Sequence, residues 1–208
     1  MLLFSRHADF ASCALLLILS WRTSTGFPVL SLSTEKCEEC SSLFKSLQLD
    51  IKGLLNSSVC HGIPTADMEM TSTAETVQAC APALTQNPGC NEQRSSSFSE
   101  SECLRNIMKD LAHYTAVIES YRNSTIRDPE GEAALLNTTL GIIHSLRKNC
   151  SLMPDGGNDT SKEDLAHTWG NDSFSNRQKM CKMMRAFHVR TITFNRAMGY
   201  ISSGDHRK

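Results

Sequence analysis

Apolar residues recur at every third or fourth position in four long stretches of the chain, and this spacing predicts four amphipathic helices. The predicted helices cover about residues 35–56, 99–122, 129–148 and 175–203. Ser99 and Glu102 form a capping box at the start of the second helix, and Asp128 followed by Pro129 is typical of the start of the third. No other stretch of useful length alternates apolar and polar residues as a half-buried strand does. The pattern therefore predicts an all-α fold.

The lengths of the connections favour one arrangement of these helices. About forty residues separate the first helix from the second, a handful join the second to the third, and about twenty-five separate the third from the fourth. A helix of ~20 residues is ~30 Å long, so a connection that returns along it needs on the order of ten extended residues, whereas a tight link makes neighbours antiparallel. The order long, short, long predicts a four-helix up-up-down-down bundle with two long crossover loops, the topology of growth-hormone and cytokine bundles.

The N-terminal part of the sequence is typical of a secretory signal peptide. Arg6 precedes a short apolar run over residues 10–21, and small residues follow up to Gly26. This run is too short to span the ~30 Å core of a bilayer as a helix. We expect a signal peptide over residues 1–26 and one secreted, extracellular domain over residues 27–208, without membrane insertion.

Composition and charge narrow the class of protein further. The 21 Lys and Arg residues nearly balance the 22 Asp and Glu residues, so a net charge of −1 provides no basic surface for nucleic acid. Nine cysteines favour an oxidising compartment, and eight of them remain once Cys13 is removed with the signal peptide. Asn-x-Ser/Thr triplets offer glycosylation sites on the same route. They begin at Asn56, Asn123, Asn137, Asn149, Asn158 and Asn171.

Four of the remaining cysteines fall into two pairs by their place in the bundle. Cys60 follows the first helix and Cys181 is near the start of the fourth, so both lie at the same end of the bundle in either topology. Cys80, in the first crossover, can reach Cys103 at the base of the second helix. Each pair predicts a disulfide that contributes ~2 to 4 kcal/mol of stability.

The pairing of the other four cysteines depends on the topology of the bundle. Cys150 ends the third helix and shares an end of the bundle with Cys37 and Cys40 only in the up-up-down-down order. In a simple up-down bundle it would lie a helix length away, beyond the ~7 Å Cα limit for a disulfide. We therefore expect Cys150 to pair with Cys37 or Cys40. The cysteine left over and Cys90 then form either a fourth internal bridge or, for Cys90, a link to another chain.

The fourth predicted helix is apolar on two sides. Its core stripe runs from Met180 to Ile201, and a second set of residues projects the opposite way at about 100° per residue. This set consists of Val189, Ile192, Arg196, Gly199 and Tyr200. Helices that are apolar on both sides are normally covered on both sides, and Arg and Tyr are enriched at interface hot spots. We expect a second protein to cover this face, with Cys90 as the candidate covalent link to it.

The alternative cover for this face is the first crossover, His61 to Phe98. That segment is rich in Thr, Ser, Gln, Asn and Pro and has few bulky apolar side chains. Its composition therefore favours a second protein as the cover.

Two stretches of the chain carry a distinctive residue spacing. They are MCKMMRAFHVRTITFNRAMGYISS, residues 180–203, and TSTAETVQACAPALTQNPGC, residues 71–90. They resemble the last helix and the first crossover of the interleukin-12 alpha subunit family, within the interleukin-6-like long-chain helical cytokines. A weaker likeness runs through ECLRNIMKDLAHY. The resemblance implies a secreted cytokine subunit that is disulfide-linked to a receptor-like beta subunit and signals through cell-surface cytokine receptors in immune regulation.

The resemblance also implies roles for individual residues. Arg196 is similar to the arginine that enters an acidic pocket on the beta subunit, and Cys90 is similar to the cysteine that bridges to it. Two internal bridges of the family match pairs in this chain, Cys60 with Cys181 and Cys80 with Cys103. The family's bridge from its N-terminal cysteine lacks a second partner here, whereas Cys40 and Cys150 are extra.

A further implied role concerns the signalling receptor. In the interleukin-6-like group, an aromatic residue at the head of the fourth helix contacts this receptor, and a cation follows three residues later. Phe174 and Arg177 resemble this pair. The alternative is that Phe174 only caps the end of the bundle.

No pattern in the sequence indicates an enzyme, a metal or a cofactor. Cys37-Glu-Glu-Cys40 has the spacing of a redox pair but lacks the strand-helix-strand setting of that motif. The histidines show no zinc-ligand spacing, and there is no Gly-rich phosphate loop or Ser/His/Asp pattern. The rival interpretations are a helical cytokine that acts without a beta subunit and a secreted helical carrier or thiol protein.

Overall fold

The computed structural model describes residues 32–64, 74–81, 98–151 and 168–204. The predicted signal peptide, Cys90, Asn158 and most of the two crossovers lie outside these ranges. Within them every regular element is an α-helix, which confirms the all-α prediction. The helices are α2 (Thr34–Asn56), α3 (Ala74–Ala79), α4 (Glu100–Arg122), α5 (Pro129–Cys150) and α7 (Ser173–Ser203).

Local side chains begin two of the long helices as the sequence predicts. The Ser99 hydroxyl accepts a hydrogen bond from the Glu102 N–H at 3.3 Å and so caps α4. Asp128 accepts from the Gly131 N–H at 3.0 Å, and Pro129 occupies the first position of α5. Each cap satisfies one of the backbone donors that a helix N-terminus leaves without a partner.

The structure corrects two expectations about helix positions. α7 begins at Ser173, two residues before the predicted start, because the Asp172 carboxylate caps it by accepting from the N–H groups of Phe174 and Ser175. The short helix α3 lies in the first crossover, where no helix was predicted. Its six residues are too few to show an apolar period.

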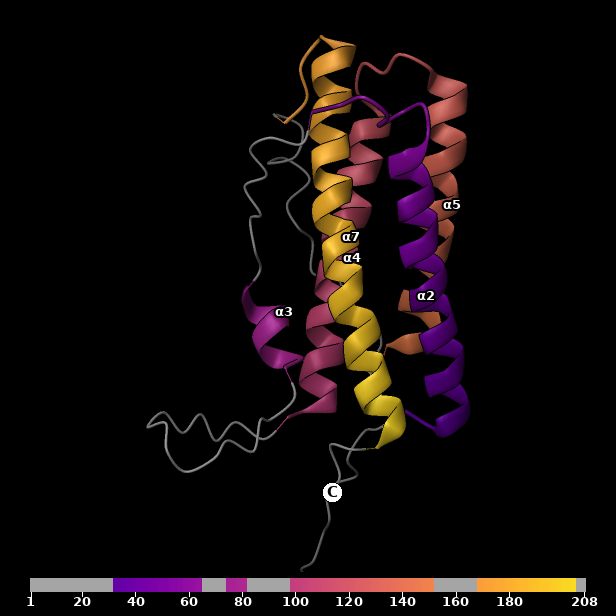
Figure 1. Cartoon of the computed structure of the whole chain (residues 1–208), viewed down its shortest axis with the longest axis vertical. Helices are drawn as coiled ribbons and strands as arrows, with labels where there is room; N and C mark the ends of the chain where they lie inside the picture. The colour runs from indigo at the N-terminus through magenta and orange to yellow at the C-terminus, as the bar shows by residue number, and fades with distance from the viewer. Residues whose placement is uncertain (1–31, 65–73, 82–97, 152–167, 205–208) are drawn as a thin grey trace, which may run out of the picture. The chain divides into compact units, whose positions relative to one another are not determined.

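The long helices form an up-up-down-down bundle, as predicted. A disulfide joins Cys40, near the start of α2, to Cys150 at the end of α5, so α2 and α5 run in opposite directions. A second joins Cys60, just after α2, to Cys181, near the start of α7, so α2 and α7 are also antiparallel. The short link after α4 makes α4 and α5 antiparallel, and Figure 1 shows α2 and α4 running one way and α5 and α7 the other.

Three disulfides join the described residues. They are Cys40–Cys150, Cys60–Cys181 and Cys80–Cys103, with Cα–Cα distances of 5.7, 5.6 and 4.7 Å. Cys40 rather than Cys37 therefore pairs with Cys150. Cys37 lies one turn earlier in α2, where its buried thiol donates to the Leu32 carbonyl at 3.8 Å. The Cys80–Cys103 disulfide attaches the end of α3 to α4.

The core lies between the four long helices, and α7 supplies much of it. The predicted stripe of α7 is buried throughout and consists of Met180, Met184, Phe187, Thr191, Phe194, Met198 and Ile201. The Phe194 ring packs edge-on against Phe44 of α2, with centroids 5.7 Å apart. The Phe187 ring stacks on Tyr114 of α4 at 3.9 Å. These contacts fix the rotation of α7 about its axis and so determine which of its residues face outward.

None of the helices in the described ranges combines the length and the apolar content that crossing a membrane requires.

Candidate protein-docking surface

The five residues predicted to project from α7 lie on its outer side and form what we call the outer face of α7. Val189 is 39% exposed, Arg196 and Gly199 are exposed, and Ile192 and Tyr200 are half-buried. A Cβ added at Gly199 would meet nothing within 4 Å, so the backbone there is open to close approach. The structure therefore brings these residues together on one surface.

The described part of the first crossover touches this face only at its end. Phe98, the residue that precedes the cap of α4, packs edge-on against Tyr200 with ring centroids 4.9 Å apart. α3 packs against α4. Residues 65–73 and 82–97 of the crossover lie outside the described ranges. The described residues of the first crossover leave Val189 and Arg196 exposed.

α7 is strongly basic. Its 31 residues include six Arg and Lys and no Asp or Glu. Most of these cations have partners in the bundle: the Lys179 ammonium donates to the Thr168 carbonyl at 2.8 Å, for example. Arg196 makes no hydrogen bond or ion pair with any described residue. Arg196 is therefore a cation that is available to an acidic group on another molecule.

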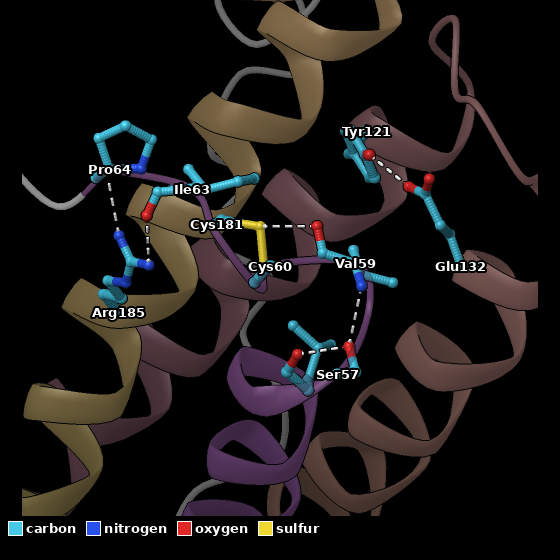
Figure 2. The surroundings of a disulfide bond; sticks show 10 residues. Ser57, Val59, Cys60, Ile63, Pro64, Tyr121, Glu132, Cys181 and Arg185 are labelled. Carbon is cyan, nitrogen blue, oxygen red and sulfur yellow. Dashed lines mark hydrogen bonds between the residues drawn. A yellow bond between two sulfur atoms is a disulfide. The ribbon is translucent and has the colours of Figure 1, made fainter.

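Arg185 shows how a neighbouring cation is held. Its guanidinium donates to the carbonyls of Ile63 and Pro64, at 3.1 and 3.5 Å, beside the Cys60–Cys181 disulfide (Figure 2). The disulfide and these hydrogen bonds attach the chain that follows α2 to α7. Arg185 therefore has partners within the chain, whereas Arg196 has none among the described residues.

A buried ion pair that the sequence analysis missed lies on the α4 side of α7. Arg190 and Asp110 are 8% and 5% exposed, and their Nε and Oδ2 atoms are 3.5 Å apart. Burial, and then the Asp110 carboxylate, raise the pKa of the neighbouring Tyr114 to about 12, while Arg190 acts to lower it. Burial lowers the pKa of His113, and Asp110 partly offsets this by raising it. In the sequence, the feature that points to this ion pair is a charged residue on the apolar side of each helix, Asp110 on α4 and Arg190 on α7.

The candidate receptor pair lies in the first two turns of α7. Phe174 is 53% exposed, and the Arg177 guanidinium carbon is 5.6 Å from the centroid of its ring. A cation at this distance over an aromatic face is attracted by the ring quadrupole. More than half of the Phe174 surface remains open, so this ring does not close the core.

A set of hydrogen bonds around the buried Asn176, which the sequence did not predict, holds the start of α7 in place. Asn176 is fully buried; its Nδ2 donates to the Thr125 and Gly170 carbonyls at 3.1 and 2.8 Å, and its Oδ1 accepts from the Gly170 N–H at 2.9 Å. The Trp169 indole donates to the Ser120 hydroxyl at 2.9 Å. The segment before α7 is thereby fastened to the end of α4 and to the link that follows it.

The Tyr121 side chain, next to these hydrogen bonds, joins α4 to α5. It donates to the Glu132 carboxylate at 2.5 Å, and its ring packs edge-on against Trp169. Burial, together with the hydrogen bond to Glu132, raises the pKa of Tyr121. These contacts join α4, α5 and the segment before α7 at the end of the bundle that carries Phe174.

No group of His, Cys, Asp and Glu side chains within the described ranges is arranged to hold a metal ion. The outer face of α7 offers apolar surface, a cation and an approachable backbone. Such an arrangement is suited to binding another protein rather than to chemistry on a small substrate.

Comparison with known proteins identifies relatives of this chain. The family model "Interleukin-12 alpha subunit" matches residues 51–204. Interleukin-12 subunit alpha of Macaca mulatta is 27% identical over 147 residues, which are 62% of this chain and 63% of the relative. The protein of the same name from Cercocebus atys is 26% identical over 184 residues, 79% of this chain and 78% of the relative. That from Capra hircus is 28% identical over 143 residues, 62% of each.

The chain therefore spans less than two thirds of the length of the Macaca and Capra relatives. No solved structure matches it.

Proposed function

Because this chain belongs to the interleukin-12 alpha subunit family, we propose that it is a secreted cytokine subunit that pairs with a receptor-like beta subunit and signals through cell-surface cytokine receptors in immune regulation. The family match and the four-helix cytokine topology support this function. The single observation that carries the pairing is the exposed Arg196, without a partner among the described residues, on an outer face that also contains Val189 and Ile192.

The composition of the outer face favours an acidic, partly apolar site on the beta subunit. A charge-assisted hydrogen bond from Arg196 to a carboxylate becomes stronger when neighbouring apolar groups exclude water. Val189 and Ile192 are the apolar neighbours, since they precede Arg196 by two turns and one turn on the same face. α7 contains no acidic side chain that would repel such a site.

We also propose that Cys90 forms the disulfide to the beta subunit. Six of the eight cysteines that follow the predicted signal peptide are used in disulfides within the bundle, and Cys37 is buried in α2. Cys90 lies in the first crossover between Cys80, which is attached to α4, and Phe98, which touches Tyr200 on the outer face. The crossover therefore ends, at Phe98, beside the proposed interface.

The proposed receptor contact lies on a different part of α7. Phe174 and Arg177 are at its start, about six and five turns before Arg196, so the two partners are able to bind at the same time. The exposed ring of Phe174 is the apolar contact, and the Arg177 cation lies beside it.

A glycan placed on the outer face tests the pairing. Val189→Asn turns positions 189–191 into an Asn-x-Thr triplet, because Thr191 is already present. On co-expression with an interleukin-12 beta-type subunit, we expect the glycosylated variant to be secreted but the mixed dimer to fall by about tenfold or more, since a bulky sugar covers the face. Immunoprecipitation of the beta subunit measures the dimer.

Val189→Gln is the matched control, because it introduces an amide of similar size without an acceptor triplet. We expect it to keep the dimer within about twofold of the parent chain, as a single peripheral contact costs little. Undiminished dimer in the glycan-bearing variant would place the beta subunit elsewhere. A parent chain that is secreted and signals with no beta subunit present would identify a cytokine that acts alone.

A further inference from the structure

A buried carboxylate of α5 lies at the end of the bundle that carries Phe174. Glu132 is 3% exposed, and its Oε2 accepts a hydrogen bond from the Tyr121 hydroxyl at 2.5 Å (Figure 2). Its Oε1 accepts from the Asp128 N–H at 3.4 Å. Both oxygens act as acceptors, as they do in an ionised carboxyl group. Both donors are neutral, so the buried charge of Glu132 needs a cation near it.

Arg177 of α7 is the cation whose charge acts on this pair. Burial and the hydrogen bond to Glu132 raise the pKa of Tyr121, and the Arg177 guanidinium acts in the opposite direction. The guanidinium is therefore close enough to this phenol to be attracted by the carboxylate bonded to it, although it makes no ion pair within the described ranges. Arg177 is half-buried, and its Nε is buried without a hydrogen bond to a described residue. Glu132 is thus an internal counter-charge for Arg177.

The same guanidinium faces the exposed ring of Phe174. Its central carbon is 5.6 Å from the ring centroid, and Phe174 is 53% exposed. The two residues are three positions apart, so the helix places both on one side. Helical spacing alone does not hold the pair together, because an arginine has many rotamers and fixing one of them costs conformational entropy. An inner charge that attracts the guanidinium favours the rotamers that keep it beside both Glu132 and the ring.

Arg196 differs from Arg177 in this respect. Arg196 is exposed and makes no hydrogen bond or ion pair with the described residues, so its charge is open to a carboxylate of another protein. Arg177 has a counter-charge inside the bundle and lies against Phe174. A carboxylate of a partner would have to compete with Glu132 for Arg177, whereas an apolar surface that packs on the Phe174 ring would not.

We propose that Glu132 is a positioning residue for the receptor contact: its buried charge keeps the Arg177 guanidinium against the Phe174 ring and so fixes the orientation of that ring. Arg177 then acts through Phe174 and is not an ion-pair partner of the receptor. The receptor surface that fits this end of the bundle is apolar, whereas the partner of the outer face of α7 is acidic. This inference rests on the proposed function, because it concerns how the receptor contact of α7 is built.

A double-mutant cycle tests the role of Glu132. Glu132→Gln removes the charge at almost constant volume and keeps polar groups for the Tyr121 hydroxyl. The purified mixed dimer is titrated on reporter cells that respond to the parent dimer. We expect Glu132→Gln to raise the half-maximal concentration by about threefold to tenfold, the range of a coupled pair. In a chain that already carries Arg177→Gln, it should change this concentration by less than about twofold, because no cation is left to position.

The outcomes of this cycle separate positioning from a general effect on the fold. If Glu132 only stabilises the bundle, its substitution should reduce signalling equally in both backgrounds; this result, or no loss in either, overturns the proposal. Glu130→Gln is the matched control, because it removes an exposed carboxylate two residues earlier in the first turn of α5. It should leave the half-maximal concentration within about twofold of the parent value, as for a surface change that touches no partner.

A second cycle uses only residues near the surface, so it remains available if Glu132→Gln lowers secretion. Arg177→Gln should raise the half-maximal concentration by about threefold to tenfold in the parent chain, but by less than about twofold in a chain that carries Phe174→Ala. A full additional loss in the Phe174→Ala chain would give Arg177 its own contact with the receptor and contradict the proposal. If Phe174→Ala by itself signalled as well as the parent, the proposed receptor contact would fail instead.

Discussion

At the scale of single residues, two arginines of α7 show that position decides the role of a side chain. Arg190 is buried and pairs with Asp110, whereas Arg196, six residues later, projects from the outer face. Six residues correspond to about 240° around a helix, so the two side chains leave the axis in very different directions. One arginine contributes to the fold, and the other makes no hydrogen bond or ion pair with the residues that the structure describes.

Arg196→Ala should weaken the association with the beta subunit. We expect a loss of roughly 2 kcal/mol or more, about a 30-fold rise in Kd, as for an arginine at the centre of an interface. The stability of the chain should change by no more than about 0.5 kcal/mol, because the side chain is exposed. Surface plasmon resonance gives the Kd and thermal unfolding gives the stability; an unchanged Kd would remove Arg196 from the interface.

Arg190→Ala is the control for this prediction, with the opposite expected result. It leaves the buried Asp110 carboxylate without its ion pair, and breaking one side of such a pair costs about 3 kcal/mol or more in the free energy of unfolding. Unfolding by urea should show this loss. If Arg190→Ala instead left the chain as stable as the parent, Arg190 would not be the partner that stabilises Asp110.

At the scale of the element, the two proposed binding surfaces of α7 are held in place in different ways. Hydrogen bonds from Asn176 and Trp169 join its first turns to the end of α4 and the link that follows it. The exposed Phe174 lies in these turns. The turns around Arg196 are held by the core stripe on the opposite side. A helix is stiff over this length, so both surfaces keep a fixed relation to each other.

Phe174→Ala should separate signalling from assembly. The exposed ring contributes little to the core, so the mixed dimer should form normally. Loss of an aromatic anchor should raise the concentration needed for half-maximal receptor signalling by about tenfold. A reporter-cell assay with the purified dimer measures this shift.

Leu49→Ala is a suitable comparison for Phe174→Ala. Leu49 is an exposed apolar residue of α2, 69% exposed, to which no partner is assigned. We expect the signalling of the Leu49 variant to match that of the parent dimer. Equal signalling by the Phe174 variant would show that the receptor does not contact this ring.

At the scale of the whole molecule, the disulfides connect parts of the chain that are far apart in sequence. Cys40–Cys150 and Cys60–Cys181 span 110 and 121 residues, whereas Cys80–Cys103 spans 23. In the chain-entropy model a disulfide that closes a longer loop removes more freedom from the unfolded chain. The two long-range disulfides, one at each end of α2, should therefore contribute most to the stability of the bundle.

Replacing a disulfide by two alanines tests this order. The pair Cys40→Ala with Cys150→Ala should lower the free energy of unfolding by about 4.8 kcal/mol, and the pair Cys80→Ala with Cys103→Ala by about 1.4 kcal/mol less than that. Both cysteines must be replaced, because Cys37 is one turn from Cys40 and could otherwise pair with Cys150. Denaturant unfolding of the two variants measures the difference; an equal loss would argue against the chain-entropy explanation.

The proposed disulfide to the beta subunit can be tested on the assembled dimer. Cys90→Ser should abolish the disulfide-linked dimer on non-reducing electrophoresis while a non-covalent dimer, held by the outer face of α7, still co-purifies with the beta subunit. Cys37→Ser is the control and should leave the covalent dimer intact, because its thiol is buried in α2. A covalent dimer that persists in the Cys90 variant would assign the link to another cysteine.

The spacing of apolar residues and the lengths of the connections could be interpreted without a structure, because each depends only on residues that are near one another in the sequence. An apolar residue at every third or fourth position marks the buried side of a helix wherever that helix packs, and connection lengths limit how helices can be joined. The four long helices, their order in the bundle and the buried stripe of α7 follow from such features. The outward position of Arg196 follows from the same period.

Only the tertiary structure decided which distant residues meet. Cys37 and Cys40 lie three residues apart on one side of α2, and the choice of Cys40 as partner of Cys150 depends on how far α2 has slid and turned against α5. The pairing of Arg190 with Asp110 depends in the same way on the register of α7 against α4. Periodicity determines the direction of a side chain around its own helix, but the axial position of one helix against another is set by packing of the whole core.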